Sequence, residues 1–470
     1  MAKQTARSAA IAALTAVLVE QQPAEDVLPT LTATLAPEDA RLADAMVKAA
    51  LRHLGQLDLL IAARLKKPLG RKLLPVQSAL RIGAAQLLLL RVPDHAAIGE
   101  TVAAVKAGKF RPYAGLVNAV LRALAGAELP PASTNLPQWL RARWAPYYPV
   151  EEICSIAAEL PPLDIVRRDG TTERFTHPYP PVDSLPGYAE GAFWVQDKAA
   201  QIPVTMLGDV RGKRVLEIGA APGGKTAQLV AAGAYVTALD RSAARMAVLR
   251  ANMARLKMQV EEVVADAREY VPAQTYDVVV LDAPCSATGT WRRHPELVHI
   301  TTLTDIKELA ALQAQMLARA WGWVKPGGRL LYIVCSLERE EGEDQIAAFL
   351  AAHPEASIDS PLLLPPHAGG VKTEAQAEAE KLEARGMHIG ENSPPHLSPS
   401  SSPLHLSPSS SPPPLAPFLL SPRLLPSSYP PRMRGGQGGE SSGILRTHPA
   451  MEKASGGMDG FFAAVLHRCA

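Results

Sequence analysis

The segment LEIGAAPGGKT, residues 216–226, decides the fold. A short apolar strand carrying Glu217 runs into a turn that contains Gly219, Gly223 and Gly224, and the turn leads into a helix. Such a turn places small residues and backbone N–H groups beside a ligand at the carboxyl end of a sheet. The spacing is not that of a P-loop. An ordinary tight strand–helix turn is the structural alternative, so the neighbouring segments must decide.

Strands alternate with helices on both sides of this turn. The pattern predicts strands at 214–220, 235–240, 259–266, 276–284 and 329–336, and helices at 225–233, 241–257 and 303–324. This alternation is typical of a parallel sheet with helices on both faces. We therefore predict an α/β, Rossmann-like domain over residues 201–385. Its final strand is expected in residues 442–470, where GMDGFFAAVLHRCA is largely apolar.

The rest of the chain differs in composition. Residues 1–128 predict an all-α domain, because helical periodicity recurs at 12–20, 39–65, 73–90, 96–108 and 113–125. Residues 129–200 begin rich in proline and lack a clear period, so they are interpreted as a linker with a short mixed subdomain. Residues 386–441 form an imperfect repeat of Ser, Pro, Leu and Gly, which predicts a disordered insertion.

Composition and charge limit the kind of protein this chain can be. The chain has 470 residues, of which 47% are hydrophobic, and a formal charge of only +2, so any basic surface for nucleic acid must be local. Four cysteines without regular spacing suggest a reducing compartment. The N-terminus reads as an amphipathic helix without a cleavage site, and no apolar run reaches membrane-spanning length. A soluble cytoplasmic protein is expected.

Three acidic residues end three of the predicted strands. Asp240, Asp266 and Asp282 would lie on one edge of one sheet, where a carboxylate can accept hydrogen bonds from a ribose diol or an adenine amino group. Helix capping explains any one of them equally well. Together they predict a nucleoside-bearing cofactor at this edge.

Two cysteines follow predicted strands at the same edge. Cys285 and Cys335 each precede a serine, whereas Cys154 and Cys469 lie in no motif and read as ordinary free thiols. A metal site is not expected, because neither a CxxC motif nor a His/Cys cluster is present. Two thiols facing a cofactor crevice suggest covalent catalysis, with one thiol as nucleophile and the other as base or leaving-group assistant.

These motifs resemble a known family. DAPCSATG, the later CS and the turn AAPGGKT are similar to the signatures of the RNA cytosine-C5 methyltransferases that use two cysteines. LRIGAAQLLLLRVPDHAAIGETV and AGLVNAVLRAL resemble a NusB-type RNA-binding domain, a fusion typical of the bacterial 16S rRNA members. The resemblance covers essentially everything except the Ser/Pro-rich insertion. It also suggests that the RNA-contacting subdomain within residues 129–200 is shortened.

The resemblance implies a role for each site residue. Cys335 would attack C6 of cytosine, which makes C5 nucleophilic toward the methyl group of S-adenosylmethionine. Cys285 would act as general base for product release, and Asp282 would hydrogen-bond the cytosine edge. The cofactor would be bound by a set spread over the turn and three strand ends, namely Gly219, Ala220, Ala221, Pro222, Gly223, Gly224, Lys225, Asp240, Asp266 and Asp282.

The loop after Cys285 carries a basic triplet. Arg292, Arg293 and His294 are expected to contact RNA phosphates, since guanidinium forks suit phosphate, although a solvated loop is the alternative. The expected partner is 16S rRNA, bound by a monomer that needs no metal. Transfer RNA as substrate, a small-molecule methyltransferase and a catalytically idle assembly factor stay open as alternatives.

Overall fold

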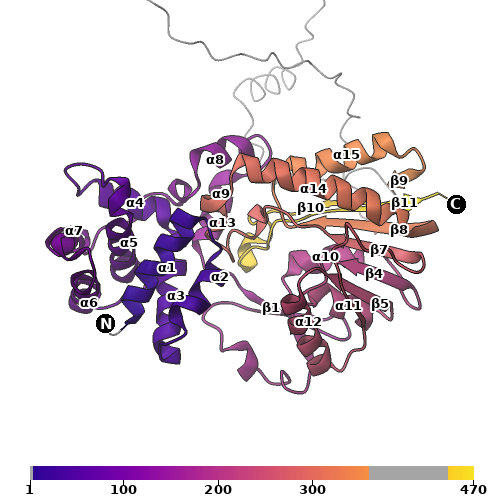
Figure 1. The fold of residues 1–470 in the computed structure, drawn as a ribbon, viewed down its shortest axis with the longest axis horizontal. Helices are drawn as coiled ribbons and strands as arrows, with labels where there is room; N and C mark the ends of the chain where they lie inside the picture. Colours follow the sequence, from indigo (N-terminus) through magenta and orange to yellow (C-terminus); the bar gives the residue numbers. More distant parts are fainter. Residues whose placement is uncertain (1–3, 359–442, 470) are drawn as a thin grey trace, which may run out of the picture. The chain divides into compact units, whose positions relative to one another are not determined.

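The computed structural model describes residues 4–358 and 443–469. The insertion predicted at 386–441 therefore lies outside the described residues. The N-terminal part is helical, as Figure 1 shows in indigo and purple. Its helices are α1 (Ala6–Glu20), α2 (Ala24–Thr32), α3 (Pro37–Arg52), α4 (Leu54–Ala62), α5 (Leu74–Leu88), α6 (Asp94–Ala107) and α7 (Ala114–Leu124). The sequence pattern had merged α3 and α4 into one helix, and α2 was not expected.

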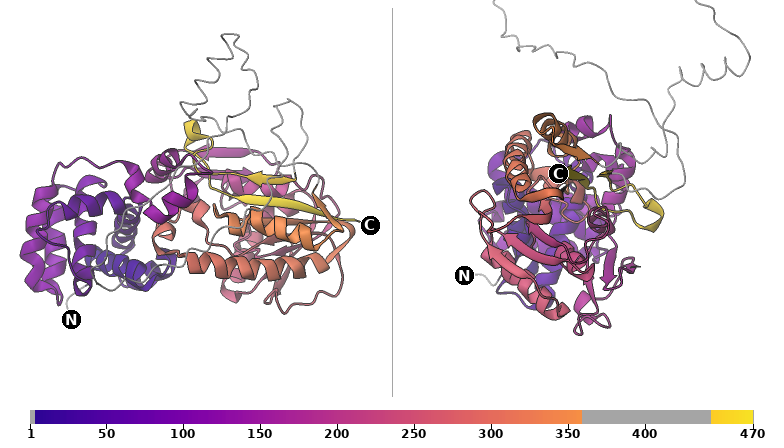
Figure 2. Two further views of the ribbon diagram at one scale, coloured as in Figure 1. Left: turned by 90° about the horizontal axis from the view of Figure 1, so that it is seen from above. Right: turned by 90° about the vertical axis from the view of Figure 1, so that its right-hand side faces the viewer.

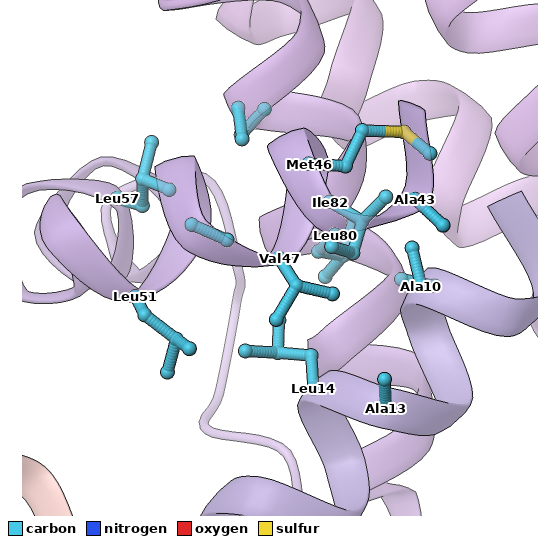
Figure 3. Packing of buried hydrophobic residues seen from close by; sticks show 14 of the residues in the cluster. Ala10, Ala13, Leu14, Ala43, Met46, Val47, Leu51, Leu57, Leu80 and Ile82 are labelled. Atoms are coloured by element: carbon cyan, nitrogen blue, oxygen red, sulfur yellow. The ribbon is translucent and has the colours of Figure 1, made fainter. Parts of the chain in front are cut away.

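Most of these helices pack an apolar stripe against α5, whereas α2 packs against α1 and α3. In α1 the buried residues recur every three or four positions: Ala6, Ala9, Ala10, Ala13, Leu14 and Val17. Helix α5 contacts α1, α3, α4, α6 and α7. Figure 3 shows Leu14, Val47 and Leu80 meeting in this core. A Cβ at Gly83 would lie 2.5 Å from the Leu121 side chain, so α5 and α7 approach closely there.

The segment interpreted as a linker contains more regular structure than its pattern predicted. It holds α8 (Gln138–Trp144), α9 (Val150–Ala158), β1 (Leu163–Arg167), β2 (Thr172–Phe175), β3 (Phe193–Val195) and the start of α10 (Lys198–Thr205). The three strands form an antiparallel sheet in the order β2-β1-β3. Strands of three to five residues are too short to show a period of two, which is why the pattern did not reveal them.

The α/β domain is built on one sheet with the strand order β10-β11-β8-β7-β4-β5-β6. Its parallel strands are β4 (Arg214–Ile218), β5 (Tyr235–Asp240), β6 (Glu261–Val264), β7 (Tyr276–Asp282) and β8 (Val324–Val334). The expected α/β, Rossmann-like class preceded by an all-α domain is confirmed. Strand β4 has β5 on one side and β7 on the other, so their carboxyl ends form the switch point at which open α/β sheets bind ligands.

Helices cover both faces of this sheet (Figure 1). One face packs against α14 (Leu303–Gly322) and α15 (Glu343–Ala352), through residues such as Trp321 and Phe349. The other face packs against α10 and α11 (Gly224–Ala231), and α12 (Ala243–Leu256) adjoins them. The short helix α13 (Leu297–Ile300) precedes α14. Among the described helices, none is long and apolar enough to cross a membrane.

The end of the chain returns to the sheet. Strand β11 (Phe462–Arg468) pairs antiparallel with β8, and it also pairs with β9 (Ala356–Ile358) and β10 (Ile444–Arg446). Figure 2 shows β10 and β11 in yellow, side by side at this edge. Residues on both sides of the undescribed segment therefore belong to one sheet, and the segment before β11 reaches the carboxyl end of β8.

Candidate active site

The glycine-rich turn after β4 adopts a backbone that only glycine accommodates easily. Gly219 has φ 78° and Gly223 has φ 105°, both in the left-handed region. A Cβ at Gly219 would lie 2.4 Å from the carbonyl oxygen of Asp282. The turn therefore lies directly against the end of β7, with small residues lining the crevice at Ala220 and Ala221. The peptide bond between Ala221 and Pro222 is cis.

Two of the predicted acids border this turn. Asp240 is 3% exposed, and its carboxylate accepts hydrogen bonds from the backbone N–H of Ala221 at 3.3 Å and of Ser242 at 2.9 Å. Asp266 accepts from the side chain and backbone of Arg268, and these bonds lower its pKa to about 2. Both acids thus stabilise turns, and neither caps a helix, which was the structural alternative; the N-cap of α12 is Ser242. Carboxylate oxygens accept more than one hydrogen bond, so that role leaves room for a ribose or adenine.

Lys225 and Asp282 form an ion pair across the crevice. Their Nζ and Oδ2 atoms are 2.8 Å apart, and the ammonium also lies over the Phe461 ring, 5.5 Å from its centroid. Burial alone would lower the pKa of Lys225, but the Asp282 carboxylate outweighs it, so the pKa is raised. The side chain of Lys225 is only 12% exposed, which excludes an exposed first-turn lysine.

The two motif cysteines meet. Their Sγ atoms are 3.4 Å apart, at the carboxyl ends of β7 and β8. The hydrogen bond with Cys335 and burial together raise the pKa of the Cys285 thiol well above its usual value. Both are free thiols and partly exposed, whereas Cys154 is buried and has its pKa raised to about 12 by that burial. A glycine-rich turn, an ion pair and two adjacent thiols therefore gather at the carboxyl end of one sheet.

Comparison with known proteins shows to which family the chain belongs. The model of the family described as 16S rRNA methyltransferase RsmB/F matches residues 204–382, and the NusB family model matches residues 4–126. "Ribosomal RNA small subunit methyltransferase B" of Klebsiella pneumoniae subsp. pneumoniae is 36% identical over 391 residues, which are 75% of this chain and 91% of that protein. The chain belongs to the RsmB/F family of rRNA methyltransferases.

Further relatives agree. The protein of the same name from Cronobacter sakazakii is 35% identical over 392 residues, again 75% of this chain and 91% of the relative. The crystal structure of PH0851 aligns over 98% of both chains with a TM-score of 0.65 at 20% identity, which shows a shared fold. As an RsmB/F family member with a NusB domain, the chain is an RNA methyltransferase of the S-adenosylmethionine-dependent class.

The basic loop of this RsmB/F member does not lie as the sequence predicted. The Arg292 side chain is fully buried, and it bonds to Asp459 at 2.7 Å, Asp197 at 2.6 Å and the carbonyl of Gly456 at 2.7 Å. Arg293 is 25% exposed and pairs with the same two carboxylates. A guanidinium with no exposed surface cannot contact a phosphate, so the RNA-contact prediction for Arg292 is wrong in this structure.

His294 is the member of the triplet that keeps substantial exposure. Its side chain is 42% exposed and lies 3.9 Å from Glu296. An RNA contact by His294 stays a prediction. The buried pairing of its two neighbours could not be seen in the sequence, because both partner aspartates are far away along the chain.

Sequence reasoning missed several residues of the RsmB/F site. Glu341 is fully buried and accepts hydrogen bonds from Ser286 and Ser336, the residues that follow the two cysteines. Gly460 approaches the Cys285 loop so closely that its N–H bonds to the Gly289 carbonyl at 2.8 Å. The serine after each cysteine was visible in the sequence and was the one available signal for a shared partner.

Glu217 lies beneath the cofactor turn. It is 1% exposed, and the Thr226 hydroxyl donates to its Oε2 at 2.6 Å. Burial raises its pKa to about 8, partly opposed by the bond from Thr226. The described residues include no group of three or more His, Cys, Asp or Glu that could hold a metal ion.

Proposed function

We propose that this chain transfers a methyl group from S-adenosylmethionine to C5 of a cytosine in 16S rRNA, through a covalent bond between Cys335 and C6. The observation that carries the proposal is the pair of thiols 3.4 Å apart beside the Lys225–Asp282 ion pair. The names of the relatives and the NusB match support a small-subunit rRNA substrate over transfer RNA.

The glycine-rich turn and the neighbouring acids suit the methyl donor. S-adenosylmethionine would supply an electrophilic methyl group, and the turn at 219–225 with Asp240 and Asp266 would hold it. The positive-φ glycines allow close approach of the ligand to the backbone, and the carboxylates suit its hydroxyl and amino groups. Lys225 and Asp282 lie where the reacting groups would meet.

Cys335 suits the attacking role. Its sulfur lies close enough to the Lys225 ammonium for the two to interact electrostatically. Addition of the Cys335 thiolate to C6 forms an S–C bond and shifts the C5–C6 electron pair toward C5. That pair would form the new bond to the methyl carbon as the methyl–sulfur bond of S-adenosylmethionine breaks and S-adenosylhomocysteine leaves. Asp282, at the same edge, would hydrogen-bond the ring as charge develops on it.

Cys285 suits the finishing role. The hydrogen bond with Cys335 and burial raise the pKa of the Cys285 thiol and so hold its proton. Once Cys335 is bonded to carbon, the hydrogen bond with Cys335 no longer raises the pKa of Cys285, and the Cys285 thiol would release its proton to solvent to give a thiolate base. It then removes the C5 proton, the C5–C6 double bond re-forms, and Cys335 leaves as a thiolate.

The experiment is tritium transfer from labelled S-adenosylmethionine to unmodified small-subunit rRNA. Wild type should label a cytosine, Cys335→Ala should not, and Cys285→Ala should accumulate a denaturation-resistant protein–RNA adduct. Labelling of transfer RNA alone would overturn the substrate, and full activity of Cys335→Ala would overturn the mechanism. A cytoplasmic location and a monomeric state stay predictions.

A further inference from the structure

One buried carboxylate contacts the residue after each catalytic cysteine. Glu341 lies at the end of the 3-10 turn Arg339–Glu341 and is 0% exposed. Its Oε1 accepts from the backbone N–H of Ser286 at 2.8 Å, and its Oε2 accepts from the hydroxyls of both Ser286 and Ser336. The two hydroxyl oxygens are 3.1 Å apart. The loops after β7 and β8 are therefore joined through Glu341.

Two further side chains extend this cluster to the other side of each cysteine. Gln313 of α14 donates to Glu341 at 3.0 Å and to the carbonyl of Pro284 at 2.8 Å. The Tyr332 hydroxyl, three residues before Cys335, donates to the Glu341 carbonyl at 2.7 Å. We call Ser286, Gln313, Tyr332, Ser336 and Glu341 the Glu341 cluster. It contacts the chain on both sides of Cys285 and of Cys335.

A buried carboxylate is costly unless its oxygens are hydrogen-bonded. Glu341 accepts four bonds, two at each oxygen, and all four donors belong to Ser286, Ser336 and Gln313. Burial raises the pKa of Glu341, and the bonds from Ser286 and Ser336 oppose that rise. None of these four hydrogen bonds involves a thiol, so Glu341 affects the position of the sulfurs through the two loops, while its charge also contributes to the raised pKa of Cys285.

We propose that Glu341 is a positioning residue, which sets the spacing of the Cys285 and Cys335 thiols by fixing the serine that follows each of them. The inference rests on the proposed function for its link to methyl transfer. The spacing itself is a property of the protein without RNA. Attack by one thiol and proton removal by the other require both sulfurs within reach of the same cytosine. Misplacement of a reacting group by about 1 Å costs up to about 100-fold in rate.

The test separates the length of the side chain from its charge. Glu341→Gln keeps the length and can accept from Ser286 and Gln313 while donating to the serine hydroxyls. Glu341→Asp keeps the charge but is one methylene shorter, so it cannot reach both loops together. Glu341→Ala removes the connection. The matched control is Glu340→Ala, because Glu340 is the adjacent acid, 40% exposed and paired with Arg143 outside the cluster.

The first measurement needs neither RNA nor cofactor. Diamide oxidises the two thiols to a Cys285–Cys335 disulfide; each sulfur loses its hydrogen, and diamide takes up both hydrogens and is reduced to the hydrazine. The rate, followed by mass spectrometry of the linked peptides, reports how often the sulfurs meet. Wild type, Glu340→Ala and Glu341→Gln should react within about threefold of one another, and Glu341→Asp and Glu341→Ala about tenfold more slowly.

The second measurement is methyl transfer. The variants should rank in kcat as they do in disulfide rate. In Glu341→Asp, kcat should fall by about tenfold or more, while the KM for S-adenosylmethionine stays at the wild-type value. An Asp variant that matches or exceeds the Gln variant in both assays would overturn the proposal. So would a folded Glu341→Ala protein that forms the disulfide at the wild-type rate. If Glu341→Ala does not fold, the order of the Gln and Asp variants still decides.

The outcome also separates this inference from the proposed function. Suppose that the disulfide rates follow the expected order but wild type methylates no cytosine. Then the proposed function fails and the spacing role of Glu341 stands. If wild type methylates cytosine but the disulfide rates do not depend on Glu341, the inference fails and the function stands.

Discussion

The helical core around α5 and the carboxyl edge of the sheet bury different kinds of side chain. The first is dominated by alanine, leucine and valine from α1, α3, α5 and α7. The second buries charged residues that are each at most 4% exposed: Glu217, Arg292, Glu341, Arg446 and Asp459. An apolar core needs only shape and area, whereas buried charges need a specific partner in a specific place.

The difference teaches where specificity comes from in this protein. Apolar packing in the helical region tolerates exchange between residues of similar volume. At the carboxyl end of the sheet, Glu341 and Arg446 contact the residues that follow the two thiols. Arg446, for example, pairs with Glu343 and donates to the Ser336 carbonyl next to Cys335. Substitutions in the two regions should therefore fail in different ways.

The largest expected effect is on activity alone. Cys335→Ala should reduce methyl transfer to below about a thousandth of wild type, because the covalent step is lost. The thermal midpoint should change by no more than a few degrees, since one sulfur is removed from a partly exposed position. Tritium transfer and calorimetry on the same samples measure both. A loss of activity that merely tracked unfolding would remove the contrast between the regions.

The next effect is on stability at the sheet edge. Arg292→Ala should destabilise the protein by about 3–5 kcal/mol, because Asp197 and Asp459 lose a fully buried partner. Arg293→Ala is the matched control with the same two partners, and its cost should be smaller because Arg293 is 25% exposed. Urea unfolding measures both free energies. Equal costs would show that burial does not govern this ion-pair group.

In the helical core, Leu80→Ala should cost about 2–5 kcal/mol through the cavity it leaves, since Leu80 is fully buried. Leu59→Ala, at a position 51% exposed, is the control and should cost less than about 1 kcal/mol. The affinity for S-adenosylmethionine, measured by calorimetry on folded protein, should stay unchanged in both. A tenfold loss of cofactor affinity in Leu80→Ala would blur the division between core and site.

The smallest expected effect is a pH dependence. The pKa of Glu217 is raised to about 8 in the folded state, so the folded protein keeps a proton that the unfolded chain releases above its ordinary value of 4.5. The stability contribution of Glu217 is full below pH 4.5 and falls as the pH rises toward 8.

Glu217→Gln should therefore gain stability relative to wild type between pH 5 and pH 8, by on the order of 2 kcal/mol. Urea midpoints measured across that range test the sign. Asp266→Asn, just after β6, is a useful contrast because the pKa of Asp266 is lowered to about 2. A Glu217→Gln difference that does not vary with pH would show that this carboxyl is ionised throughout.

Local patterns in the sequence determined the α/β and all-α regions, the glycine turn and the identity of the two thiols. Periodicity, positive-φ glycines and strand-end acids are properties of neighbouring residues, so one chain suffices to read them. The proximity of Cys285 to Cys335 followed from two parallel strands that end at the same edge of the sheet.

Only the tertiary structure decided which charges face outward. Arg292 and Arg293 read as phosphate ligands until Asp197 and Asp459, each roughly a hundred or more positions away, are seen to pair with them. Glu341 was hidden for the same reason, because two of the four hydrogen bonds to its carboxylate come from Ser286 in the loop after β7, 55 residues earlier. A residue's type predicts the bonds it can make, but burial and distant partners determine which bonds it does make.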